Sequence, residues 1–169
     1  MIRRTVVGLG SNLGDRQANI EGAIAAVAAL PCVALLSRSS IWETEPIGGP
    51  PQPHFYNAAV LLAHGGDPLE LLDHLLRIES TFGRTRTVPN APRTLDLDIL
   101  WAEGVSLRGP RLCLPHPRLH ERAFALAPLL DVAPDASDPD SGTPYATVFA
   151  SLAAAGIRRQ GPPLDASRA

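Results

Sequence analysis

Runs of apolar residues alternate with polar turns along the chain, in an order that predicts a mixed α and β fold. "TVVGLG" (5–10) is the short apolar run of a buried strand, and "NIEGAIAAVAAL" (19–30) repeats apolar residues at helical spacing until Pro31. "VALLSRSSIWETEP" (33–46) and "FYNAAVLLAH" (55–64) are both rich in residues that favour strands. The first third therefore predicts a strand, a helix and two further strands.

The next segment, 67–83, gives the clearest helix signal in the chain. Asp67 is placed to cap the helix, Pro68 suits the first helical position, and Gly83 can end it. "TLDLDILWAEG" (94–104) then predicts another strand. The order strand, helix, strand, strand, helix, strand is that of the ferredoxin-like plan, so we predict an α+β fold in which an antiparallel sheet carries helices on one face.

The last third of the sequence predicts a hairpin and helices in addition to the ferredoxin-like core. "VSLRGPRLCLP" (105–115) favours a short hairpin, and 121–133 and 145–156 favour helices packed at the edge. Residues 160–169, "QGPPLDASRA", favour a frayed tail. We therefore expect one domain over 1–159.

The alternation in "PRTLDLDIL" (92–100) places two acids where a strand normally carries none. Residues two apart on a strand share a face, with Cα atoms about 6.6 Å apart, so Asp96 and Asp98 project side by side. Leu95, Leu97, Ile99 and Trp101 are expected on the opposite, core-facing side. Two adjacent carboxylates repel each other unless a cation lies near them, and oxygen ligands suit Mg²⁺, which indicates a divalent-metal site.

Two long loops precede these acids in the sequence, Glu45–His54 and Arg84–Arg93. Loops of such length often cover sites. The second carries Arg84, Arg86 and Arg93 and no acid, a local cationic patch whose guanidinium groups suit phosphate oxygens.

The amino-acid composition excludes several classes of partner and of catalytic mechanism. The 169 residues have a formal net charge of -2, which indicates neither nucleic-acid nor membrane binding, and all 15 basic residues are arginine. The absence of lysine excludes Schiff-base catalysis and the phosphate-binding lysine of a Walker A loop. Two distant cysteines, Cys32 and Cys113, fit a reducing compartment, and no run of apolar residues reaches membrane-spanning length. We expect a cytoplasmic protein.

Several alternatives remain open from the residues alone. The two aspartates could lie on the exposed polar face of an edge strand, or belong to a two-metal nuclease or phosphohydrolase, although no basic track supports a nuclease. A regulatory module that binds a nucleotide without turnover is a further alternative. Cys113, His116 and His120 have spacings that a zinc site could use, but a fourth ligand is missing. "GLGSNLG" (8–14) fails as a Rossmann signal because Leu13 replaces the third glycine.

Taken in order, four blocks resemble the 6-hydroxymethyl-7,8-dihydropterin pyrophosphokinase family of folate biosynthesis: "GLGSNLGDR", "NAAV", "GRTRTVPNAPRTLDLDIL" and "LPHPRLHERAFALAPLLDVAP". The resemblance implies transfer of pyrophosphate from ATP to the hydroxymethyl group of the dihydropterin, with release of AMP, in an enzyme that uses two Mg²⁺ ions. The implied partners are these small molecules, with no nucleic acid and no membrane, and a monomer is expected.

The same resemblance assigns roles by motif position. Asp96 and Asp98 would bind both metal ions, and the catalytic set would also include Arg84, Arg86, Arg93, His116 and Arg122. The ATP site would comprise Glu79, Ile99, Arg111, Cys113, His116 and Arg122, with the main chain of Ile99 and Cys113 reading adenine. The pterin would stack on Phe55 and Phe124 and bond to Asn57 and the backbone at Thr44 and Ile47.

This chain departs from the family pattern in its arginine loop. Better-known members place a tryptophan where this chain has Asn90, and the loop here is a residue shorter. The resemblance therefore implies that loop closure differs in this chain.

Overall fold

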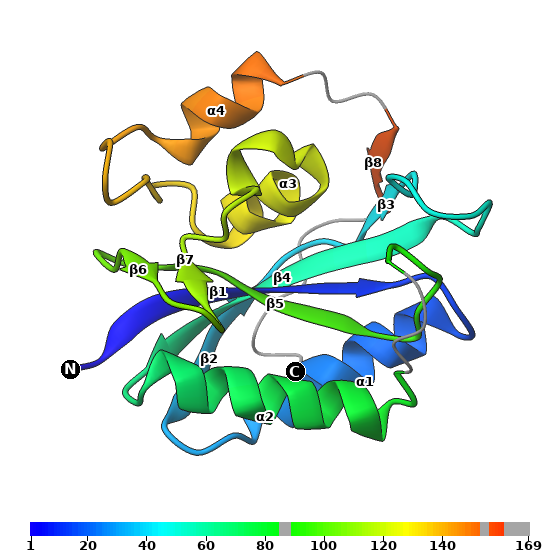
Figure 1. The fold of residues 1–169 in the computed structure, drawn as a ribbon, viewed down its shortest axis with the longest axis horizontal. Helices are drawn as coiled ribbons and strands as arrows, with labels where there is room; N and C mark the ends of the chain where they lie inside the picture. The colour runs from blue at the N-terminus through cyan, green and yellow to red at the C-terminus, as the bar shows by residue number, and fades with distance from the viewer. Residues whose placement is uncertain (85–88, 153–155, 161–169) are drawn as a thin grey trace.

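A computed structural model describes residues 1–84, 89–152 and 156–160 of the chain (Figure 1). Its elements are β1 (Arg3–Ser11), α1 (Arg16–Ala28), β2 (Val33–Arg38), β3 (Trp42–Thr44), β4 (Phe55–His64), α2 (Pro68–Thr81), β5 (Asp96–Ala102), β6 (Leu107–Arg108), β7 (Cys113–Leu114), a 3-10 turn (Leu119–Glu121), α3 (Ala123–Val132), α4 (Tyr145–Ser151) and β8 (Ile157–Arg159). Among the described residues no helix is both long and apolar enough to cross a bilayer.

The main sheet has the strand order β5-β1-β4-β3-β8, with β2 also paired to β4, and every pair is antiparallel. β6 and β7 form a separate two-stranded hairpin. The α+β class, the antiparallel sheet and the C-terminal hairpin are therefore confirmed.

Helices α1 and α2 cover one face of the sheet (Figure 1). The predicted start of α2 is confirmed, because the Asp67 side chain accepts a 2.9 Å hydrogen bond from the N–H of Leu69. Gly83, at φ +80°, follows the helix in the left-handed region that favours glycine. Leu71 and Leu75 are buried against the sheet with the apolar side chains of α1 and β5. This face forms the first of two cores.

Helix α3 packs across the opposite face of the sheet, not at its edge as predicted (Figure 1). Its sequence, AFALAPLLDV, is apolar around most of its circumference, which is typical of a helix with buried surroundings. Leu126 and Leu129 are fully buried against Val6 and Leu61 of the sheet. The sheet thus has a core on each face, and α3 borders the side on which the candidate site lies.

A bulge interrupts the alternation of β5. Val7 pairs with Ile99 while Val6 pairs with Trp101, so Leu100 is an extra residue on β5. Leu97 and Ile99 face the α1 and α2 core as predicted, whereas Trp101 lies in the core beneath α3. The prediction for Trp101 was wrong because one inserted residue reverses the face of everything after it.

The C-terminal segment contains a strand that the sequence pattern does not reveal. The predicted helix 145–156 ends at Ser151, and Ile157–Arg159 forms β8, which pairs with β3. Arg159 bonds to Asp131 of α3 at 2.9 Å and lies 4.7 Å from the Trp42 ring centroid. Of the expected tail, only Gln160 lies within the described residues, and its N–H bonds to the carbonyl of Ile41 at 2.7 Å.

Candidate active site

The two aspartates of β5 face the α3 side of the sheet, as their spacing predicts. Asp96 pairs across the sheet with Gly10 of β1, and Asp98 pairs with Gly8. Neither glycine has a side chain, so space is left on the sheet beside the two carboxylates. Both aspartates, Gly8 and Gly10 line one hollow between the sheet and α3.

Asp96 is held by arginines of the preceding loop. Arg84 donates to its Oδ1 at 2.9 Å, and the Arg93 Nε lies 3.4 Å from its Oδ2. Arg84 also donates to the carbonyl of Leu95 at 2.9 Å and lies 3.4 Å from the carboxylate of Glu79. The predicted proximity of the arginine loop and the aspartates is therefore present for Arg84 and Arg93. Arg86 lies outside the described residues.

Asp98 has no side-chain hydrogen bond or ion pair within the part of the chain that the structure describes. Burial, reinforced by the neighbouring charge of Asp96, raises the pKa of the Asp98 carboxyl well above its ordinary value. An ionised Asp98 is therefore costly without a cation. Two oxygen donors on one face, one of them lacking a partner, fit a hard divalent cation such as Mg²⁺.

We predict that Asp98→Asn stabilises the metal-free protein at alkaline pH. The pKa of Asp98 is higher in the folded chain than its ordinary value of 3.8, so its ionisation costs stability that grows as pH rises above that value. The neutral amide removes this cost. In EDTA, the variant should melt roughly 3 °C or more above the parent at pH 8.5. The difference should shrink at pH 4.5, and an equal or lower melting temperature at pH 8.5 would contradict the assignment.

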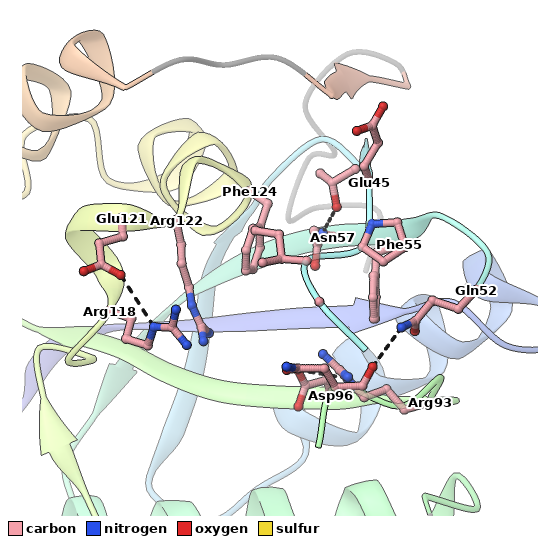
Figure 2. Close-up of a pocket in the computed structure, with 15 residues that line it drawn as sticks. Glu45, Gln52, Phe55, Asn57, Arg93, Asp96, Arg118, Glu121, Arg122 and Phe124 are labelled. Atoms are coloured by element: carbon pink, nitrogen blue, oxygen red, sulfur yellow. Dashed lines mark hydrogen bonds and ion pairs between the residues drawn. The ribbon is translucent and has the colours of Figure 1, made fainter. Parts of the chain in front are cut away.

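Beside the carboxylates lies a pocket of about 240 Å³ (Figure 2). Its lining comes from β3, β4, β5, both long loops, the 3-10 turn and the start of α3: Thr44, Glu45, Pro46, Ile47, Gly48, Gln52, Phe55, Asn57, Asn90, Arg93, Asp96, Arg118, Glu121, Arg122 and Phe124. Figure 2 shows the rings of Phe55 and Phe124 on either side of Asn57. All five residues expected to hold the pterin line this one pocket, although they come from distant parts of the chain.

The polar end of this pocket is set by Asn57. Its Nδ2 donates a 2.6 Å hydrogen bond to Oγ1 of Thr44, which is buried. Ile47, in contrast, is 61 % exposed, so its backbone lies at the rim. A pocket that combines two aromatic rings with a few fixed polar groups suits a planar heterocycle.

Arg122 and His116 lie near enough to the two carboxylates to interact with their charge. Arg122 lines both the pocket and the hollow beneath α3. Burial, with the nearby charge of Arg122, lowers the pKa of His116 to about 4. His116 is thus neutral at pH 7, and because its Nδ1 accepts from the N–H of Arg118 at 3.2 Å, its proton is on Nε2. That N–H can donate to an anion.

The remaining residues expected at the ATP site lie apart from this pocket. Ile99 is buried on β5, an edge strand, and Cys113 lies on β7 next to it. Arg111 pairs with Asp73 of α2, and Glu79 is buried, where its carboxylate accepts from the N–H of Leu97 at 2.8 Å. None of these four is among the described residues that line the pocket or the hollow.

Asn12, which the sequence analysis left without a role, connects the two long loops. Its Nδ2 donates to Oε1 of Gln52 at 2.8 Å and to the carbonyl of Pro53 at 2.9 Å. Its Oδ1 accepts from the N–H of Arg93 at 2.9 Å. Gln52 in turn donates to the carbonyl of Asn90 at 2.8 Å. The only sequence signal for Asn12 was its place in the glycine-rich "GLGSNLG".

The zinc alternative has no support in the described residues, where no three His, Cys, Asp or Glu side chains gather to hold a metal. The Cys113 thiol points to the carbonyl of Gly109 at 3.7 Å. His120 pairs instead with Asp138, at 2.9 Å.

Comparison with known proteins gives a consistent result. The family model described as 7,8-dihydro-6-hydroxymethylpterin-pyrophosphokinase (HPPK) matches residues 6–134. A 2-amino-4-hydroxy-6-hydroxymethyldihydropteridine pyrophosphokinase of Pseudomonas aeruginosa is 42% identical over 159 residues, which cover 94% of this chain and 98% of the relative. The Synechocystis protein of the same name is 44% identical over 137 residues, 81% of this chain and 70% of that protein.

Solved structures share the fold. A Plasmodium falciparum HPPK-DHPS in complex with pterin and p-hydroxybenzoate aligns with a TM-score of 0.67 at 14% identity over 89% of this chain. A second, described as HPPK-DHPS in complex with substrates, aligns with a TM-score of 0.67 at 15% identity over 89% of this chain. This chain spans 43% of each of those two chains.

Proposed function

The chain belongs to the 7,8-dihydro-6-hydroxymethylpterin-pyrophosphokinase family, and from that premise we propose how its own residues carry out the reaction. The enzyme transfers pyrophosphate to 6-hydroxymethyl-7,8-dihydropterin in folate biosynthesis, with ATP as co-substrate. In this transfer the hydroxymethyl oxygen forms a bond to the β-phosphorus of ATP. The bond from that phosphorus to the oxygen bridging to the α-phosphate breaks, and AMP leaves.

Asp96 and Asp98 are the proposed ligands of two Mg²⁺ ions. Their shared face, their oxygen donors and the lack of a described partner for Asp98 support this role. Bound Mg²⁺ would neutralise triphosphate charge and orient the phosphates beside the pterin. The two carboxylates would supply only some of the metal ligands, since Mg²⁺ usually keeps waters and substrate phosphates as the others.

The pterin is proposed to lie between Phe55 and Phe124, with its polar edge toward Asn57 and the backbone of Thr44 and Ile47. The common lining of one pocket by these five residues supports the placement. Contact with the two rings would hold the heterocycle in one plane. Because Asp96 lines the same pocket, the hydroxymethyl group would point toward the metal ligands.

Four arginines are proposed to neutralise the phosphates: Arg84, Arg86, Arg93 and Arg122. Arg84 and Arg93 contact Asp96 in this structure, so binding of a cation at Asp96 would free both guanidinium groups for phosphate oxygens. His116 would donate its Nε2 proton to an anionic oxygen. No covalent nucleophile is needed, because positioning and charge neutralisation dominate phosphoryl-type transfer.

Adenine is proposed to bind the main chain at Ile99 and Cys113, with Arg111 and Glu79 nearby. The place of β5 at the edge of the sheet, beside β7, supports this, since edge strands can offer backbone groups to a ligand. A monomer is likewise proposed. Residues 1–159 are proposed as one domain, and the use of ATP supports a cytoplasmic enzyme.

The observation that carries the proposal is the single pocket in which two aromatic rings, Asn57 and Asp96 meet (Figure 2). The test mixes the protein with Mg-ATP and 6-hydroxymethyl-7,8-dihydropterin and identifies the products by mass. AMP and the pterin diphosphate are expected. Formation of ADP, or nucleotide turnover that does not depend on the pterin, would overturn the proposal.

A further inference from the structure

Gly10 lies between Asn57, which is proposed to bind the pterin, and Asp96, which is proposed to bind the metal ions. It lies on β1, where its cross-strand partners are Asn57 on β4 and Asp96 on β5. Residues directly opposite one another in an antiparallel sheet project to the same face. A side chain at position 10 would therefore stand between the amide of Asn57 and the carboxylate of Asp96.

The space above Gly10 is already used by its neighbours. A Cβ at this position would lie 2.9 Å from Oδ1 of Asn57, 3.7 Å from a ring carbon of Phe55 and 3.8 Å from Cβ of Asp96. The first distance is too short for a carbon and an oxygen in contact. One of the two atoms would have to move.

Asn57 has little freedom to move without losing its orientation. Its Nδ2 is bonded at 2.6 Å to Oγ1 of Thr44, and Thr44 is 2% exposed on β3. Oδ1 is fixed on the other side of the same planar amide, above Gly10. Rotating the amide away from a new Cβ would therefore break the bond to Thr44 or turn the amide away from the pocket.

We propose that Gly10 is a positioning residue for the dihydropterin, because its missing side chain leaves the space that the Asn57 amide oxygen needs. The inference rests on the proposed function, in which Asn57 binds the polar edge of the pterin. Gly10 acts through Asn57 and contributes no group of its own. It also gives the glycine-rich segment of β1 a role in substrate recognition, in place of the dinucleotide binding that its sequence pattern fails to support.

The primary test is Gly10→Ala, with steady-state kinetics for each substrate and thermal melting. The KM for the dihydropterin should rise at least about tenfold, the effect of losing one well-oriented hydrogen bond. The KM for ATP should stay within about twofold of the parent, since no residue proposed for adenine contacts Gly10. An unchanged pterin KM in a folded Gly10→Ala variant would overturn the inference.

A double-mutant cycle isolates the route through Asn57. In an Asn57→Ala background the displaced oxygen is absent, so adding Gly10→Ala should change the pterin KM by less than about twofold. If the two effects multiply instead, Gly10 does not act through Asn57 and the inference is wrong.

Thr44→Val is a second test, in which the sequence of β1 is unchanged. It removes the acceptor for Nδ2 and should also raise the pterin KM, so an unchanged value would contradict the inference even if Gly10→Ala fails to fold.

Gly22→Ala provides a matched control. A Cβ there would approach Cζ of Phe82 at the same distance, 2.9 Å, but between α1 and the end of α2, away from the pocket. This variant should lower the melting temperature without raising the pterin KM. An equal rise in both variants would make the effect one of general crowding and overturn the inference. A parent protein that makes no pterin diphosphate would instead refute the proposed function.

Discussion

We expect Asp96→Asn and Asp98→Asn each to lower kcat by at least about a thousandfold, while the protein stays folded. Asparagine keeps the shape of the side chain and removes the negative charge that a divalent cation requires. Both aspartates face the same side of β5 and are proposed to share the metal ions, so the loss of either removes a ligand. The measurement is AMP release with saturating Mg-ATP and dihydropterin, alongside circular dichroism.

Asp140→Asn is the control for this pair of variants. Asp140 is a carboxylate outside the pocket that pairs with Arg108 at 2.9 Å, so its loss should leave kcat unchanged. Activity near the parent level in either Asp96→Asn or Asp98→Asn would refute the assignment of both residues as metal ligands. Asp98→Asn is also predicted to stabilise the metal-free chain. This one substitution should therefore raise the melting temperature and lower kcat.

Arg122→Ala is the second variant with a large expected effect, a fall in kcat/KM for ATP of about 100-fold or more. The side chain lines both the pocket and the hollow, and burial lowers the pKa of its guanidinium without abolishing its charge. Its loss leaves triphosphate charge uncompensated next to Asp98. Arg122→Lys should recover part of the activity, because lysine restores the charge but not the fork of donors.

Arg108→Ala is the matched control for Arg122, since its side chain is 78% exposed and pairs only with a surface acid among the described residues. It should leave kcat/KM within about twofold. A similar loss of activity in both arginine variants would indicate a general effect of net charge. Full activity in Arg122→Ala would remove this residue from the proposed site.

Local sequence patterns predicted the parts of this molecule that depend on neighbours in the chain. The caps of α2 follow from Asp67, Pro68 and Gly83, and the shared face of Asp96 and Asp98 follows from strand periodicity. These features need no knowledge of distant contacts. The family resemblance then added the pterin residues, which the structure brings into one pocket.

Features that depend on distant partners were not predicted. The bulge at Leu100 arises from pairing with β1, and it moved Trp101 to the other face. β8 is only three residues long and is defined by the edge of β3 that it joins. Asn12 gained its role from Gln52 and Arg93, 40 and 81 positions away.

The contacts of Asn12 also have a thermodynamic consequence. The loop 45–54 borders the pocket proposed for the pterin, and the loop 84–93 carries arginines proposed to bind phosphate. The buried amide of Asn12 bonds to both loops. A shift of one loop on ligand binding would therefore alter the hydrogen bonds that Asn12 makes to the other. By linkage, the factor by which nucleotide changes the affinity for pterin equals the factor by which pterin changes the affinity for nucleotide. A side chain with no proposed contact to either substrate would thus couple the binding of the two.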